Sequence, residues 1–387
     1  MKRLLVTAAV ALILALPAAA QTRATGTIVV QVVADPPSAG VNWTYSGAGP
    51  LFKLGATATT RTASDLKTGT HRLVETTPAG SPQTLTALTC TSGKVDRLKA
   101  AATISLAADE TVTCTFTHRA LGPRPGAAAV ATAEQYAPVL HLAAAEHYRP
   151  LAMQDYVAKA SLRSGTPPRG KLAQSAPTLF SLPTGTGASY LDVRGAEPYL
   201  HASQYRTLEQ QLEQSQPRPT VYWRIARQAS TGTTAIEYWF LYLYNDFADK
   251  HEADWEGVTV FVKDGKPIGS AYSQHQGRAW NAATDDHPEV YVAAGSHANY
   301  PSPGSYRVKV CFTVTSRRCT TVSQRDNARG DGATLTSSDY DLVQLGGTGF
   351  TGSWGSGNYV LGIGLTRDRI VDPRRRSDYS NPFTAVP

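Results

Sequence analysis

The sequence has little charge, and this shortage excludes one class of partner. Only 17% of its 387 residues are Asp, Glu, Lys or Arg, against about 25% in an ordinary soluble protein. No block of five or more Lys or Arg occurs, although the formal net charge is +7. Because a dedicated nucleic-acid binder concentrates its positive charge in a patch or stripe, we expect no nucleic-acid partner.

Long apolar runs are also scarce. The longest, residues 4–16, follows Lys2 and Arg3 and precedes Pro17 and three alanines. A charged start, a short apolar stretch and small residues are typical of a secretory signal peptide. We therefore assign residues 1–20 to a signal peptide and expect a secreted, periplasmic or cell-surface protein of bacterial origin. No later segment offers the eighteen or so apolar residues of a transmembrane helix.

The four cysteines fit an oxidising compartment, in which disulfides persist. They form two local pairs, Cys90 with Cys114 and Cys311 with Cys319. The second pair lies in two strand-like runs joined by a short turn, so a hairpin would bring its cysteines together. A zinc site would need closer Cys-x-x-Cys spacing. We predict two structural disulfides.

Residues 25–118 consist of short β-branched runs separated by Gly, Ser, Pro and Asp, a spacing typical of a β-sandwich. The predicted strands are 27–33, 52–54, 71–75, 84–90, 102–107 and 111–117.

The phrases 67–75 and 113–118 resemble the prealbumin-like (SpaA/CnaB-type) surface domains. In those domains a Lys and an Asn can form an isopeptide bond beside a Glu. Here Glu75 is present, but Gln31 and His118 stand at the Lys and Asn places, so we expect no cross-link. The resemblance implies a spacer or adhesive stalk, and we assign it residues 21–118 without chemistry.

Residues 119–133, rich in Gly, Pro and Ala, are predicted to be a linker. Residues 134–387 are predicted to form a larger antiparallel β-sandwich with a few short peripheral helices, so the whole chain is assigned to the mainly all-β class. Helical patches are expected at 143–146, 153–159 and 208–214. The expected strands are 221–226, 235–244, 256–262, 289–293 and 306–315.

The most distinctive segment is 245–256, between two predicted strands. Asp246 ends the first strand, His251 lies in the loop, and Asp254 and Glu256 alternate onto one face of the second strand. Carboxylates this close repel and favour a proton or a cation between them. Oxygen-rich ligation favours Ca²⁺ or Mg²⁺, with Mn²⁺ as an alternative because of the imidazole. We predict a divalent-cation site here; the alternative is a solvated acidic loop.

The pattern His251-x-x-Asp254-Trp255-Glu256 after a Tyr/Trp-rich strand resembles the signature motif of the necrosis- and ethylene-inducing-like proteins, which ends His-Asp-Trp-Glu. That family comprises secreted cytolysins that recognise sphingolipid headgroups. Its cation is held by an Asp after the aromatic strand and by the His, Asp and Glu of the motif. The resemblance places these ligands on Asp246, His251, Asp254 and Glu256.

Two departures from that motif mean that toxicity is not transferred: Lys250 replaces its first Gly, and Ala253 replaces its second His. A closer resemblance, spanning most of 134–383, is to the vacuolar protein sorting-associated protein 62 family, whose activity is not well established. This resemblance lies in the segments 238–245, 251–256, 288–301 and 350–355.

Further polar residues follow neighbouring strands and are candidates for the same site. His275 and His297 could handle a proton if the chain is a hydrolase, and Asn299 could donate to an oxyanion or a headgroup. The alternative is that these residues are structural and hydrogen-bonded. Alternation along 238–244 leaves half the rings facing outward, so Tyr244 is a candidate for stacking on a sugar.

Three functions agree with these observations. The first is a secreted binding protein that depends on a divalent cation and recognises a cell-surface glycan, a lipid headgroup or another anionic or polyol ligand. The second is a metal-assisted hydrolase of phosphoester or glycosidic bonds. The third is a structural adhesion protein. Whether the chain is an enzyme, and its oligomeric state, are left open by the sequence.

Overall fold

A computed structural model describes residues 24–387, except for 36–41, 56, 77–82, 98–99, 121–125, 166, 168–169, 185–187, 197, 199, 217, 276, 283–284, 316–317, 347, 357–358 and 361–369. The predicted signal peptide, residues 1–20, lies outside the described residues. No helix among the described residues is long and apolar enough to cross a membrane.

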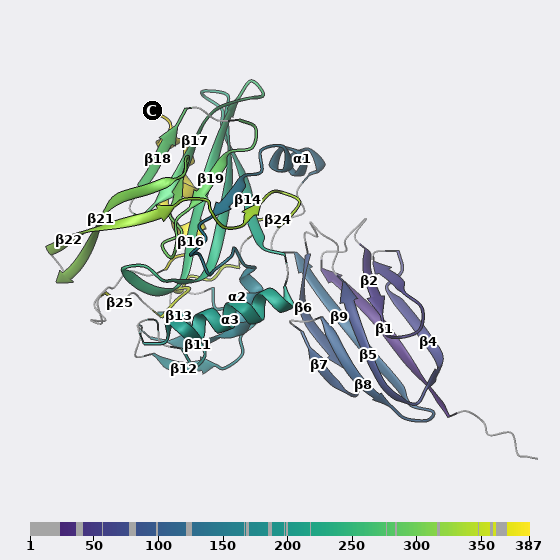
Figure 1. Ribbon diagram of the computed structural model, residues 1–387. Coiled ribbons are helices and arrows are strands. Elements are labelled where there is room, and N and C mark those ends of the chain that lie inside the picture. The colour runs from purple at the N-terminus through teal and green to yellow at the C-terminus, as the bar shows by residue number, and fades with distance from the viewer. Residues whose placement is uncertain are drawn as a thin grey trace, which may run out of the picture.

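The expectation of a mainly β chain is confirmed. The β-branched runs of residues 25–120 form two sheets that enclose a core of their own (Figure 1). The first sheet contains β1 (Thr25–Asp35), β4 (Thr60–Lys67), β6 (Gln83–Cys90) and β9 (Thr111–Ala120), in the order β4-β1-β9-β6. The second contains β2 (Asn42–Ser46), β3 (Phe52–Gly55), β5 (Gly69–Thr76), β7 (Lys94–Asp96) and β8 (Ala101–Leu106), in the order β3-β2-β5-β8-β7.

Two devices join the strands of this small sandwich. The predicted Cys90–Cys114 disulfide is present and links β6 to β9. Between the sheets, Glu75 accepts hydrogen bonds from the hydroxyl of Tyr45 (2.5 Å) and from the ring of His118 (2.9 Å), and all three side chains are buried. Because buried polar groups are costly without partners, this network specifies how the two sheets face each other.

The large sheet of the second unit carries the residues of interest. It contains β14 (Thr220–Gln228), β15 (Thr233–Asn245), β16 (Asp249–Lys263), β17 (Lys266–Gln274), β18 (Gly277–Asn281) and β24 (Asp341–Gln344), in the order β18-β17-β16-β15-β14-β24. An additional short strand, β25 (Tyr359–Val360), pairs with β16. The predicted hairpin of 221–226 and 235–244 is therefore confirmed as β14 and β15.

Smaller sheets surround this one. One comprises β10 (Val139–Leu142), β19 (Glu289–Val292), β20 (Asn299–Tyr300) and β23 (Thr334–Leu335); a second comprises β11 (Ala160–Ser164), β12 (Lys171–Gln174) and β13 (Ser189–Val193); a third is the hairpin of β21 (Gly304–Thr315) and β22 (Arg318–Ala328). The sheets of the chain are mostly antiparallel, but three described pairs are parallel: β1 with β9, β10 with β19 and β14 with β24.

The hairpin of β21 and β22 agrees with the sequence. In its register Cys311 is opposite Thr321, and Cys319 is opposite Thr313. The two cysteines are therefore not directly opposite each other but are offset by two positions along the hairpin. The side chains of Cys311 and Cys319 lie outside the described part, so the second disulfide stays a prediction.

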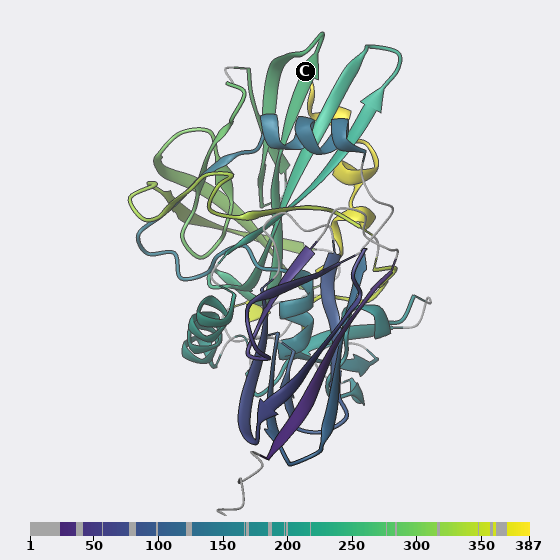
Figure 2. The same ribbon diagram turned by 90° about the vertical axis from the view of Figure 1, so that its right-hand side faces the viewer.

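The helices differ from expectation in two places. Helix α1 (Ala127–Gln135) occupies part of the predicted linker and lies across the strands of the large sheet (Figure 2). The patch 143–146 is a turn rather than a helix, because the Glu146 carboxylate accepts the next two backbone N–H groups. The helix predicted at 153–159 is confirmed as α2 (Met153–Lys159), and α3 (Ala202–Ser215) extends the helix predicted at 208–214.

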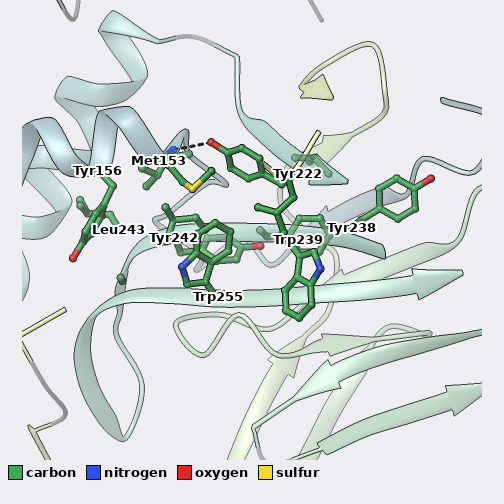
Figure 3. Close-up of a cluster of buried hydrophobic side chains, with 14 of the residues drawn as sticks. Met153, Tyr156, Tyr222, Tyr238, Trp239, Tyr242, Leu243 and Trp255 are labelled. Atoms are coloured by element: carbon green, nitrogen blue, oxygen red, sulfur yellow. Dashed lines mark hydrogen bonds between the residues drawn. The ribbon is translucent and has the colours of Figure 1, made fainter. Parts of the chain in front are cut away.

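The core of the larger unit is centred on β15 and β16. From Ala235 to Asn245 every residue of β15 is buried, because smaller elements cover both faces of the large sheet. Tyr222, Trp239, Tyr242 and Trp255 pack there with Met153, whose N–H donates to the Tyr222 hydroxyl at 2.8 Å (Figure 3). The expectation that half of 238–244 faces outward is therefore wrong.

Candidate functional site

Two carboxylates of β16 lie on one face of the strand, directly after a residue with an irregular backbone. Ala253 has a left-handed backbone (φ +53°), which is uncommon for a residue other than Gly. Asp254 pairs in register with Tyr242 on β15, and Glu256 pairs with Phe240. Regular alternation from Asp254 onward puts Asp254 and Glu256 on the same face, as the sequence predicted.

Asp254 is bonded to a buried histidine. Nδ1 of His297 lies 2.9 Å from an Asp254 carboxylate oxygen, and Nε2 lies 3.5 Å from Oε1 of Glu146. The ring stacks on Tyr242 with centroids 3.9 Å apart and an interplanar angle of 5°, and it meets Tyr148 edge-on. His297 therefore sits between two carboxylates and against two aromatic rings, away from solvent.

This environment fixes the charge of His297. Burial alone lowers the pKa of His297, but the negative charge of Glu146 and the hydrogen bond to Asp254 outweigh it and raise the pKa to about 10. The ring is therefore an imidazolium near neutral pH. An imidazolium donates a proton rather than accepting one, so in a hydrolase His297 would act as an acid, and its role in handling a proton stays a prediction.

The turn after β10 and the loop after β19 hold the other end of this network. Glu146 accepts hydrogen bonds from the backbone N–H groups of His147 and Tyr148, both at 2.8 Å, and from Gly295 at 2.7 Å. Gly295 has φ +76°, and a Cβ there would lie 2.7 Å from the carbonyl oxygen of Asp246. Only Gly allows this loop to approach the end of β15 so closely.

Glu256 continues the site along β16. Its carboxylate accepts a hydrogen bond from the hydroxyl of Ser273 on β17, and the same hydroxyl oxygen accepts the N–H of Gly257 at 3.0 Å. Burial raises the pKa of Glu256 well above its ordinary value, and the charge of Asp254 adds to that rise. The nearby Arg376 guanidinium opposes it. Burial therefore favours the protonated form of Glu256, or a cation beside its carboxylate.

Behind the His297 loop lies a second buried carboxylate, Asp326 on β22. It accepts hydrogen bonds from the hydroxyls of Tyr300 (2.6 Å) and Ser296 (2.9 Å), and Nε2 of His275 lies 2.7 Å from it. His275 therefore faces Asp326 rather than the pair Asp254 and Glu256. Both His275 (φ +38°) and His297 (φ +54°) have left-handed backbones, a strain that clusters at functional sites.

Asn299, another predicted site residue, lies on β20 directly after the His297 loop and is fully buried. Its amide nitrogen donates to the carbonyl oxygen of Gly257 at 3.3 Å. Its Oδ1 has no hydrogen-bond partner among the described residues, which is costly for a buried oxygen.

The two remaining predicted ligands have other partners. Asp246 forms ion pairs with Lys250 and with Arg206, the latter at 2.9 Å. His251 is buried; its Nδ1 lies 2.7 Å from the carbonyl oxygen of Ala253, and its Nε2 lies 2.8 Å from the amide nitrogen of Asn245. Because a carbonyl only accepts, Nδ1 carries the proton and Nε2 accepts from Asn245. Neither residue is bonded to Asp254 or Glu256.

Tyr244 is not available to a sugar. Its ring is fully buried and stacks on Tyr205 of α3 with centroids 4.1 Å apart, and its hydroxyl donates to the carbonyl oxygen of Pro198. The prediction that Tyr244 binds ligand is therefore wrong, because α3 covers the face on which it projects.

Sequence reasoning missed Glu146, Asp326 and Glu252, three buried carboxylates around the predicted residues. Glu146 follows an Ala-rich run that suggested a helix, and Asp326 stands in a charged run that matches no motif. Glu252 is adjacent to a predicted ligand but faces α3 and β13. As the side chains stand, no three His, Cys, Asp or Glu of the described segments form a group that could hold a metal ion.

Comparisons with known proteins give distant structural neighbours only. A scan against family models and a search of curated proteins gave no match. Among solved structures, the chain is similar to NLPPya in complex with mannosamine (16% identity, TM-score 0.28, 58% of this chain and 76% of that chain). It is similar to necrosis and ethylene inducing protein 2 from the causal agent of cocoa's witches' broom disease (15%, TM-score 0.26, 57% and 75%). A streptococcal ancillary pilin also matches (9%, TM-score 0.20, 72% and 63%).

These neighbours include necrosis- and ethylene-inducing proteins, the family that the motif of 251–256 resembles. The predicted likenesses to the vacuolar protein sorting-associated protein 62 family and to prealbumin-like domains stay predictions, and so do the domain boundaries drawn from them.

Proposed function

We propose that the chain is an exported binding protein whose buried carboxylates take a divalent cation and, through it, an anionic or polyol ligand such as a glycan or lipid headgroup. The observation that carries this proposal is the buried charge around Asp254. Asp254, Glu256 and Glu146 lie together, and His297 is the one imidazolium between them. Buried carboxylates need a proton or a cation, and these three lie near the imidazolium of His297 and the Arg376 guanidinium.

The donor atoms suit a hard cation. Asp254 and Glu256 supply carboxylate oxygens from one strand face, and Oδ1 of Asn299 is a buried acceptor without a partner among the described residues. Ca²⁺ and Mg²⁺ prefer such oxygen ligands, and Mn²⁺ also accepts them. A bound cation would supply the positive charge that attracts ligand oxygens.

Asp246 and His251 could bind the cation only if their side chains left their present partners. Asp246 would have to leave Lys250 and Arg206, and His251 would have to give up the hydrogen bond from Asn245. We therefore expect Asp254 and Glu256 to account for most of the affinity, with Asp246 adding less.

Export is part of the proposal. A disulfide such as Cys90–Cys114 persists in the periplasm or outside the cell. The predicted signal peptide, residues 1–20, would direct the chain there. The hydrolase alternative would use His275, which lies against Asp326, or His297, whose raised pKa suits a proton donor.

Titration calorimetry of the protein with Ca²⁺, Mg²⁺ and Mn²⁺ tests the cation. We expect saturable binding that Asp254→Asn and Glu256→Gln each weaken by at least about tenfold, or about 1.4 kcal/mol. Asp264→Asn is the matched control, because Asp264 is exposed in a turn with φ +52°, which Asn tolerates. Absence of binding by the unmodified protein at about 10 mM cation, or equal binding by all variants, contradicts the proposal.

Mannosamine and glucosamine, named with the structural neighbours, are convenient first probes for the ligand. The proposal expects any sugar or headgroup that binds to do so only with the cation present and to be lost in Asp254→Asn. Release of a product over time would instead favour the hydrolase.

A further inference from the structure

A cavity beside α3 carries two buried carboxylates that the proposed cation site does not use. It lies between α3 and the segments that lead into α2 and β14, and its volume of about 20 Å³ admits one group the size of a water molecule or an ammonium head, with a mouth open to solvent. In Figure 1, α3 runs below the strands of the large sheet, with α2 beside it. Asp155 of α2 and Glu209 of α3 both line the cavity, and they are only 5% and 3% exposed.

Glu209 lacks a partner for half of its carboxylate. Its Oε1 accepts the backbone N–H of Arg149 at 3.0 Å, whereas its Oε2 is buried and has no hydrogen-bond partner among the residues that the structure describes. Among the described residues, the Asp155 carboxylate accepts no hydrogen bond and forms no ion pair. Arg97 and Lys159 act on it only through their charge. Burial raises the pKa of both carboxyls, to about 7 for Asp155 and about 8 for Glu209.

The positive charges in the cavity wall are paired with other carboxylates. Nε of Arg149 lies 2.7 Å from Glu213, and Nε of Arg218 lies 2.8 Å from Asp341. Within the lining, Glu209 and Asp155 are therefore the acceptors left for a cation that enters from solvent.

The remaining wall is apolar and selects the kind of cation. Pro150, Leu151, Ala152, Leu212 and Pro219 complete the lining. A divalent metal would want three or more oxygen ligands, whereas a primary ammonium has three N–H donors and an alkyl stem that packs on apolar surface.

From these contacts we propose that the cavity binds the primary ammonium group of an aliphatic amine, with Glu209 and Asp155 as its acceptors. The amine stem lies along Leu151 and Leu212, and the ammonium replaces the proton that Glu209 otherwise keeps. This site shares no residue with the cation site at Asp254, although the charge of Glu146 reaches Glu209.

The test uses the full chain at about pH 8, where an alkylamine is still charged. Ethylammonium and Nα-acetyl-lysine methylamide are titrated separately by calorimetry, so that a free amine is distinguished from a lysine side chain. Tetramethylammonium is the charge control, because it has no N–H donor. We expect millimolar binding of at least one primary amine and none of tetramethylammonium.

Glu209→Gln should weaken that binding by at least about tenfold, while Glu134→Gln, an exposed change on α1, should leave it unchanged. If Glu209→Gln does not fold, judged by its thermal transition, Asp155→Asn decides in its place. No primary-amine binding up to about 100 mM overturns the proposal. Equal binding by the unmodified chain and the variants, or equally tight binding of tetramethylammonium, does so too.

Discussion

Glu252 provides a direct test of how buried carboxylates set the stability of the larger sandwich. Its side chain is fully buried and accepts hydrogen bonds from the N–H of Val193 (3.0 Å), the hydroxyl of Tyr205 (2.7 Å) and the N–H of Ser356 (3.0 Å). Burial raises the pKa of Glu252 from 4.5 to about 8, and the charge of Asp192 adds to that rise.

The sign of the pH effect follows from this shift. Between pH 4.5 and about 8 the folded chain keeps a proton on Glu252 that the unfolded chain releases. The free energy of unfolding therefore falls as pH rises through this window, by up to about 1.4 kcal/mol per pH unit from this group. The Gln of the Glu252→Gln variant cannot titrate, so the free energy of unfolding of the variant falls less steeply with pH. The difference from the unmodified chain changes by up to about 4 kcal/mol over three pH units.

At pH 5 the substitution carries a cost of its own. The Gln oxygen replaces Oε1 as acceptor, but the amide nitrogen meets the N–H of Ser356, so two donors face each other. Leaving such a buried pair unsatisfied costs about 1–3 kcal/mol. The variant should be less stable than the unmodified chain at pH 5 and should equal or exceed it by pH 8.

Urea unfolding at several values between pH 5 and pH 8, followed by tryptophan fluorescence with the disulfide intact, measures both slopes. Glu134→Gln serves as the control, because this exposed side chain should leave the slope unchanged. Parallel pH dependences for Glu252→Gln and the unmodified chain would refute the assignment of a retained proton to Glu252.

Three more expectations follow from the site and the small sandwich. His297→Asn removes the imidazolium between Glu146 and Asp254 and should lower the free energy of unfolding by about 3–5 kcal/mol. Adding Asp254→Asn should restore part of the lost free energy. If the losses of the two single variants simply add in the double variant, as measured by urea unfolding, the pairing is contradicted. Gly295→Ala brings a Cβ to 2.7 Å from a carbonyl oxygen at φ +76° and should cost about 1–3 kcal/mol; an unchanged melting temperature would contradict that close approach. Replacing Cys90 and Cys114 together by Ser should destabilise the small sandwich by about 2–4 kcal/mol. In scanning calorimetry the unfolding transition of the small sandwich should move to lower temperature, and that of the larger unit should stay unchanged.

Local patterns predicted much of the fold. The β-branched run before Asp35-Pro36-Pro37, the hairpin of β14 and β15, and helix α2 each carry their own signal in periodicity or turn residues. The burial of β15 on both faces was not predictable from alternation, because tertiary packing by α2, α3 and the small sheets covers the second face.

The candidate site was predictable only where alternation holds. Asp254 and Glu256 share a face because β16 is regular from Asp254 onward. At Ala253 the left-handed backbone breaks the pattern, and Ala carries no signal for it. The partners Glu146 and Asp326 come from segments about 110 residues before and 70 residues after the motif, and no local pattern relates segments that far apart.

The most direct test of the central claim is a crystal structure of the protein soaked in Mn²⁺, with anomalous data collected. The account predicts an anomalous peak within about 2.1–2.6 Å of carboxylate oxygens of both Asp254 and Glu256, absent in Glu256→Gln. Data of equal quality that show no peak at this position, or a peak held only by other carboxylates, would contradict it.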